Sequence, residues 1–271
     1  GITHAEGLIP FFSNFKHTKD SKTLSHRFNN AIISENGEEE YKDLIDKIFE
    51  QEECSKFIIR QLYVWFVNSE ITTEIETNII APLAKNIRDN DYEIVPALKV
   101  LLSSDHFFES TFCMVKSPID LMLSATKSLL VNAPTTSIKE QYDFALVIYL
   151  ACSDLNQSIF HHPDVAGWKA YYQAPLYYKS WINSYLLPKR LDYCRILVTG
   201  GDLVIDNKKY TVPPLVPVLQ IAGGIANATD PNVLVKELAN QLFNYEITQE
   251  QITALKDILI PGLPDMEWMM E

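Results

Sequence analysis

The residues best suited to chemistry are His162 and Asp164, which lie two positions apart within the segment 159–185. A histidine side chain titrates near neutral pH and can act as a general base, and a nearby carboxylate can orient it or act as an acid. Asp154 is a second candidate for this acidic partner. The pattern therefore allows a hydrolase that uses His162 and Asp164 as catalytic residues.

No established catalytic motif accompanies this pair. The sequence has no Gly-x-Ser-x-Gly, His-Glu-x-x-His or phosphate-binding-loop pattern. Lys116 and Arg190 are candidates for binding an anionic substrate in such an enzyme. The structural alternative is that His162 caps its loop and Asp164 holds the turn. The sequence leaves open whether the protein is an enzyme.

The same segment is dense in aromatic residues, which suits a binding site. Residues 159–185 contain eight Phe, Trp and Tyr residues. Each ring offers a large apolar area, and Tyr and Trp also carry a polar group. We expect a pocket wall for a sugar or another flat ligand. The candidate ligand-binding residues are Trp168, Tyr171, Tyr172, Tyr178, Trp181 and Asn183. The alternative is a plug, in which the aromatic side chains fill the space between helices.

Helix-breaking residues determine the local structure expected here. They stand at Pro163, Gly167 and Pro175. Residues 160–175 are therefore expected to form an ordered loop. Three aromatic residues spaced by four are expected on one face of the helix that follows, namely Tyr177, Trp181 and Tyr185.

Helical periodicity dominates most of the remaining chain. Residues 38–51 and 73–88 repeat apolar positions at the helical spacing. Residues 54–68 are apolar on nearly all sides, which predicts a buried central helix in which Arg60 needs a carboxylate or carbonyl partner. The period changes near 202–212, where a turn with Asn predicts a β-hairpin. The expected fold is mainly α, an irregular multi-helix bundle with one small β-hairpin near residues 202–212.

Local signals mark other features of the chain. Ser117 before Pro118 and Thr248 before Gln251 predict helix N-termini. Residues 1–37 are expected to be irregular or extended. Their polar residues fit a solvated loop better than a metal site, and they include His17, Asp20, Lys22 and His26.

Composition limits the function classes. With 271 residues and 47% hydrophobic content, the chain can bury a core, and we expect a single domain over 1–271. A net charge of −12 without a basic stripe argues against nucleic acid binding. No apolar run approaches the roughly 18 residues of a membrane span. We expect no metal and no cofactor, since zinc-site spacing is absent from the four cysteines, Cys54, Cys113, Cys152 and Cys194.

Five sequence blocks carry a family resemblance. They are CSKFIIRQLYVWFVN (54–68), LKVLLSSDHFF (98–108), VKSPIDLMLSATKSL (115–129), HPDVAGWKAYYQAPLYYKSWINS (162–184) and LPKRLDYCRIL (187–197). The fourth block is the most specific, with PDVAGW at 163–168 and WINS at 181–184. These blocks resemble the bacterial family called domain of unknown function 1800, in its Bacteroidetes branch. The chain departs from the family pattern at His162, where many members have a second proline.

The resemblance implies a mainly helical protein that is usually exported, so a periplasmic or secreted location is expected. Family members are usually longer, and this chain resembles their C-terminal half. The resemblance transfers no catalytic residues. We therefore expect a binding or scaffold module of the cell envelope, with a glycan or an envelope protein as its partner, and the hydrolase as the alternative.

Overall fold

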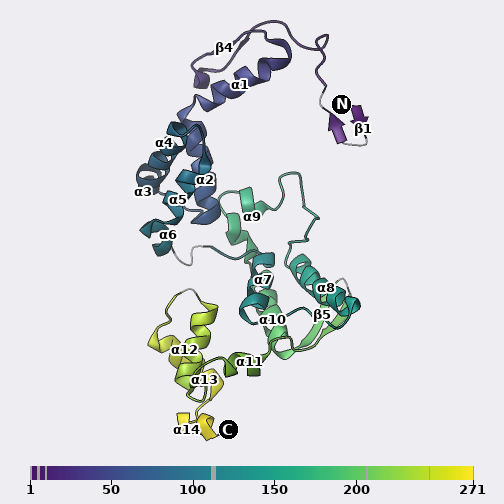
Figure 1. Ribbon diagram of the computed structural model, residues 1–271, viewed down its shortest axis with the longest axis vertical. Coiled ribbons are helices and arrows are strands. Elements are labelled where there is room, and N and C mark those ends of the chain that lie inside the picture. Colours follow the sequence, from purple (N-terminus) through teal and green to yellow (C-terminus); the bar gives the residue numbers. More distant parts are fainter. Residues whose placement is uncertain are drawn as a thin grey trace. The chain divides into compact units, whose positions relative to one another are not determined.

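The chain falls into two compact units. The computed structural model describes residues 2–4, 7–9, 11–110, 114–205, 207–243 and 245–270 (Figure 1). Contacts divide the chain into Gly1–Glu109 and Ser110–Glu271, and each unit is described on its own. This division into compact units does not test the expectation of one domain over 1–271, which stays a prediction.

The first unit begins with short strands and continues as helices. Strands β1 (Ile2–His4) and β2 (Gly7–Ile9) pair antiparallel, as do β3 (Lys22–Thr23) and β4 (Ile32–Ile33). The sequence did not predict these two pairs. The helices are α1 (Glu40–Phe49), α2 (Glu52–Phe66), α3 (Thr73–Ile75), α4 (Ala81–Asp89), α5 (Ile94–Leu102) and α6 (Asp105–Glu109). A π-helical turn, Glu76–Ile80, joins α3 to α4.

Helices α2, α4 and α5 share the core of this unit. Its buried side chains are Ile59, Tyr63, Val67, Ile80, Leu83, Ala84, Ile87, Ala97 and Leu101. Ile59 and Tyr63 lie one turn apart on one side of α2. The prediction that residues 54–68 form a buried central helix is wrong for part of its surface, because Phe57 and Trp65 are 58% and 53% exposed. The helix buries one face only, and apolar composition alone did not identify which one.

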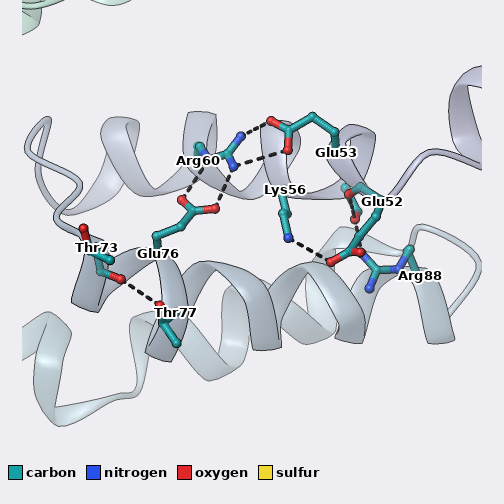
Figure 2. Close-up of polar contacts among 9 residues, drawn as sticks. Glu52, Glu53, Lys56, Arg60, Thr73, Glu76, Thr77 and Arg88 are labelled. Carbon is teal, nitrogen blue, oxygen red and sulfur yellow. Dashed lines mark hydrogen bonds and ion pairs between the residues drawn. The ribbon is translucent and has the colours of Figure 1, made fainter. Parts of the chain in front are cut away.

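The carboxylate partner expected for Arg60 is present. Its Nε and Nη2 donate to the two carboxylate oxygens of Glu76 over 2.9 and 2.6 Å, and Nη1 donates to Glu53 (Figure 2). The hydrogen bonds from Arg60 hold the pKa of Glu76 below its ordinary value. This paired fork connects α2 to the start of the π-helical turn.

The second unit consists of helices and one hairpin. Its helices are α7 (Pro118–Ser128), α8 (Ile138–Asp154), α9 (Lys169–Tyr172), α10 (Leu186–Thr199), α11 (Val218–Gly223), α12 (Pro231–Leu242), α13 (Gln249–Leu259) and α14 (Asp265–Met270). Strands β5 (Gly201–Ile205) and β6 (Lys208–Val212) pair antiparallel. The predicted mainly α fold and the hairpin are confirmed.

The hairpin packs on the main core of this unit. Leu203 and Ile205 of β5 are buried together with Ile196 of α10 and Cys152 of α8. Alternate residues of a strand point to the same face, so Leu203 and Ile205 both reach this core. The core fixes α8 and α10, the two long helices that flank the aromatic segment in the sequence.

Candidate functional site

The aromatic segment forms part of a pocket at the end of α8. The pocket has a volume of about 450 Å³. We call it the Trp168 pocket, and its wall consists of Ser153, Asn156, Ser158, His161, Pro163, Trp168, Lys169, Ala170, Ser180 and Trp181. Two indole rings thus meet several hydroxyl and amide side chains in one concave site.

The end of α8 positions the polar part of this wall. The chain leaves the helix at Leu155, and Asn156 adopts a left-handed backbone conformation with a φ of 68°. The Ser153 and Ser158 hydroxyl oxygens lie 2.7 Å apart and share a hydrogen bond. Asparagine tolerates the left-handed region better than most residues, so it suits this tight exit from the helix.

Gln157 joins this exit to two other elements. Its side chain is buried, Oε1 accepts from the Ile119 N–H over 2.8 Å, and Nε2 donates to the Tyr171 hydroxyl over 2.8 Å. The amide therefore connects the N-terminus of α7 with α9. Sequence reasoning missed Gln157, because no local pattern distinguishes a glutamine that makes such bonds from an exposed one.

The aromatic residues divide between packing and lining. Tyr178 and Trp181 are buried around Ala170, and Trp168 and Tyr171 are partly buried against them. The Tyr171 ring meets the rings of Trp168 and Trp181 edge to face, with centroids 6.2 and 5.9 Å away. This geometry is favourable for aromatic pairs. Of the predicted ligand-binding residues, Trp168 and Trp181 line the pocket.

His162 and Asp164 have separate neighbours. The His162 ring lies 4.3 Å from the Trp168 ring. Asp164 accepts from the Ala166 N–H over 2.8 Å and from the Tyr172 hydroxyl over 3.0 Å. This hydrogen bond to Asp164 raises the pKa of Tyr172. Within the described residues no hydrogen bond joins His162 to Asp164, so the catalytic pair stays a prediction.

The alternative acid, Asp154, is held in an ion pair. Lys189 Nζ lies 2.5 Å from both of its carboxylate oxygens, and the Tyr193 hydroxyl donates to it over 2.7 Å. Burial and the hydrogen bond to Asp154 raise the pKa of Tyr193. Lys189 also lies 4.4 Å over the Tyr185 ring. Asp154 therefore binds α8 to α10.

The two candidate anion-binding cations have other partners. Arg190 is buried, and its Nη2 donates to the carbonyl oxygen of Lys116 over 2.8 Å. The Lys116 ammonium donates to the Ser124 hydroxyl over 3.0 Å. Burial lowers the pKa of Arg190. Arg190 thus supports the chain before α7.

Asn183 lies between two helical segments and hydrogen-bonds to the start of α10, which overturns one expectation. Its Oδ1 accepts from the N–H groups of Tyr185 and Leu186 over 2.9 and 2.8 Å. Residues Tyr177–Trp181 form a 3₁₀ helix that ends before the extended Ile182. The prediction that Tyr177, Trp181 and Tyr185 share one helix face is wrong, because this boundary separates Tyr185 from the other two.

Comparison of the sequence with models of known protein families identifies the family of this chain. A family model described as "Protein of unknown function (DUF1800)" matches residues 2–265. The chain belongs to this family. A search of curated proteins and a search of solved structures each found no match. The family description assigns no activity.

Metal ligands do not gather in the described part of this DUF1800 protein. No group of three or more His, Cys, Asp or Glu residues there could hold a metal ion. His17 Nε2 instead lies 3.0 Å from Glu40, which also pairs with Lys22 over 2.6 Å. Cys54, Cys152 and Cys194 are free thiols, while Cys113 lies outside the described residues.

None of the described helices of this DUF1800 protein is long and apolar enough to cross a membrane.

Proposed function

We propose that the protein is a saccharide-binding module of the cell envelope and that the sugar occupies the Trp168 pocket. The observation that carries the proposal is that Trp168 and Trp181 line one concavity of about 450 Å³ together with three serine hydroxyl groups and one asparagine amide. Small-molecule pockets usually have volumes of about 300–1,000 Å³. The space therefore suits one or two sugar rings.

The lining matches the two surfaces of a pyranose. The C–H face of a sugar ring is apolar and packs on an indole ring, as other flat apolar surfaces do. Its hydroxyl groups need both donors and acceptors. The Ser180 hydroxyl can do both, the hydrogen-bonded pair of Ser153 and Ser158 keeps one donor and several acceptor positions, and Asn156 offers an amide.

The support around the pocket favours binding without reorganisation. Gln157 fixes the position of Tyr171, whose ring contacts both Trp168 and Trp181. A wall that is already ordered loses less conformational entropy when a ligand binds. An envelope protein as ligand has no comparable support.

Within the described residues, no contact of His162 or Asp164 supports the hydrolase alternative in the way that the pocket lining supports saccharide binding. Asp164 uses its carboxylate to hold its own turn and the Tyr172 hydroxyl. His162 packs against Trp168. These contacts favour a role for both residues in maintaining the shape of the loop next to the pocket over a role in proton transfer.

We also propose, from the sequence blocks quoted above, that the chain is the C-terminal half of a longer protein of the Bacteroidetes branch and is exported to the periplasm or secreted. Blocks 54–68 and 162–184 support this proposal through their resemblance to that branch. Fractionation of the native host, with antibody detection of the full-length protein, tests it. Detection in the cytoplasmic fraction alone would contradict the proposed location.

A thermal-shift screen tests the proposed function. The protein would be heated with neutral and acidic oligosaccharides and with peptidoglycan fragments. A ligand at 100 times its dissociation constant adds about 2.7 kcal/mol to the stability, which gives a clear shift in Tm. We expect at least one saccharide to raise the Tm of the wild type and not that of Trp168→Ala. No shift with any member of the panel would contradict the proposal.

A further inference from the structure

The Trp168 pocket carries a charge pattern opposite to that of the whole protein. The chain has 35 acidic and 23 basic residues, for a net charge of −12. The described wall of the pocket nevertheless contains Lys169 and His161 and no carboxylate. A cationic wall in an acidic protein needs an explanation that solubility does not supply.

Lys169 is available to a ligand. It is the first residue of α9, its side chain is exposed, and it lines the pocket beside Trp168. Within the described chain its ammonium has no ion pair and no hydrogen bond, whereas the Lys189 ammonium is held by Asp154. Lys169 therefore keeps its full capacity of three donors and one charge.

The nearest carboxylates in the sequence have their own partners. Asp164 belongs to the same loop but does not line the pocket, and it accepts from Ala166 and Tyr172. Asp154 follows the wall residue Ser153 and is neutralised by Lys189. Neither carboxylate occupies the place beside Lys169 that an anionic ligand would take.

His161 adds a second nitrogen-bearing group to this wall. Its Nδ1 donates to the Ile159 carbonyl oxygen over 3.2 Å, which leaves Nε2 for a ligand. A neutral imidazole Nε2 in this tautomer accepts a hydrogen bond from a sugar hydroxyl. The permanent charge of the wall therefore comes from Lys169, and His161 supports the recognition of hydroxyl groups.

We propose that the Trp168 pocket selects an acidic saccharide, in which a pyranose ring packs on Trp168 and its anionic group binds the Lys169 ammonium. This inference rests on the saccharide-binding function proposed above and specifies its ligand class. A lysine ammonium is a compact positive charge with N–H donors, so it can bind either a carboxylate or a sulfate. The shared chemistry is an anion carried on a sugar ring.

Matched pairs of saccharides test the proposal. One pair is an oligogalacturonate and its methyl ester, a second is a glucuronate-containing oligosaccharide and its carboxyl-reduced form, and a third is a sulfated disaccharide and its desulfated form. Calorimetry would give the dissociation constant of each for the wild type, Lys169→Gln and Lys208→Gln. Lys208 is an exposed lysine of the hairpin outside the pocket and serves as the matched control.

The expected result is that the acidic member of at least one pair binds about tenfold more tightly than its neutral partner. Lys169→Gln should remove this advantage, so that both members of the pair bind equally, while Lys208→Gln should retain it. Added salt should weaken binding of the acidic member in the wild type. The first two pairs identify a carboxylate ligand and the third identifies a sulfate.

Two other outcomes separate this inference from the function on which it rests. Equal or tighter binding of neutral partners, or an advantage that survives Lys169→Gln, would overturn the acidic selection while saccharide binding stands. Absence of binding by every member of the three pairs would overturn the inference and count equally against the saccharide-binding function.

Discussion

The side-chain amide of Gln157 donates to the hydroxyl of Tyr171 over 2.8 Å, and the same side chain accepts from the Ile119 N–H. Since Gln157 is buried, neither bond can be replaced by water without rearrangement. One glutamine thus fixes the distance between the end of α8, the start of α7 and the ring that supports the Trp168 pocket.

Gln157→Ala should lower the stability of the second unit. The change removes the acceptor of the buried Ile119 N–H and the hydrogen bond to the Tyr171 hydroxyl, and leaving a buried donor unsatisfied costs about 1–3 kcal/mol. Chemical denaturation would measure this loss. Gln220→Ala is the matched control, because Gln220 is exposed on α11 and should change the free energy of unfolding by less than about 0.5 kcal/mol. Equal stability of the two variants would contradict the role of Gln157.

Tyr178 and Tyr185 should respond differently to truncation. Tyr178 is 5% exposed and packs with Trp181, so Tyr178→Ala should cost about 3–5 kcal/mol. Tyr185 is 61% exposed and loses mainly its contact with Lys189, worth about 0.5–1 kcal/mol at such a site. Thermal melts of both variants measure the contrast. Comparable losses of stability in the two variants would contradict the assignment of Tyr178 to the packed part of the aromatic segment.

Asp154→Asn should act on stability. The Asp154 and Lys189 side chains are 19% and 26% exposed, and removing the carboxylate leaves the ammonium without its ion pair. We expect a loss of about 1–3 kcal/mol, less than for a fully buried pair. The surface variant Asp192→Asn, which breaks an exposed pair with Arg195, should cost no more than about 1 kcal/mol. A full-stability Asp154→Asn protein would revive Asp154 as a candidate acid.

The stability of the first unit should fall in acid. Hydrogen bonds from Arg60 lower the pKa of Glu76 from 4.5 in the folded state, so the pair contributes stability above pH 4.5. That contribution is lost as the pH falls from 4.5 through the lower folded pKa. Glu76→Gln should therefore show a smaller loss of stability over this range, measured by denaturation at several pH values. Glu35→Gln, at an exposed glutamate, should keep the wild-type slope. A wild-type slope in Glu76→Gln would contradict the pairing.

Local signals predicted the helix starts and the hairpin well. Ser117 accepts from the Asp120 N–H, and Thr248 forms a capping box with Gln251, as their sequence patterns indicate. The hairpin appears at β5 and β6 with Asn207 in the left-handed region. These features depend on residues within four or five positions of each other, which a sequence displays directly.

The pocket could be predicted only in part. Trp168 and Trp181 were expected to line it, because their ring size and spacing are visible in the sequence. Ser153, Ser158 and Ser180 were missed, since serines in turns are common and only tertiary packing brings these three to one wall. The regular spacing from Tyr177 to Tyr185 predicts one helix face, which the structure does not have. The backbone is extended at Ile182, and Asn183 then accepts from the N–H groups of Tyr185 and Leu186 where α10 starts, so the spacing does not continue along one helix.

The most direct test of the account is calorimetric titration of the wild type, Trp168→Ala and Trp65→Ala with the saccharide that gives the largest thermal shift. Trp65 is exposed in the first unit and does not line the pocket, so it controls for loss of any tryptophan. We predict that Trp168→Ala weakens binding by at least about tenfold, a loss of about 1.4 kcal/mol, while Trp65→Ala binds as the wild type does. Unchanged affinity in a folded Trp168→Ala protein would contradict the assignment of saccharide binding to the Trp168 pocket.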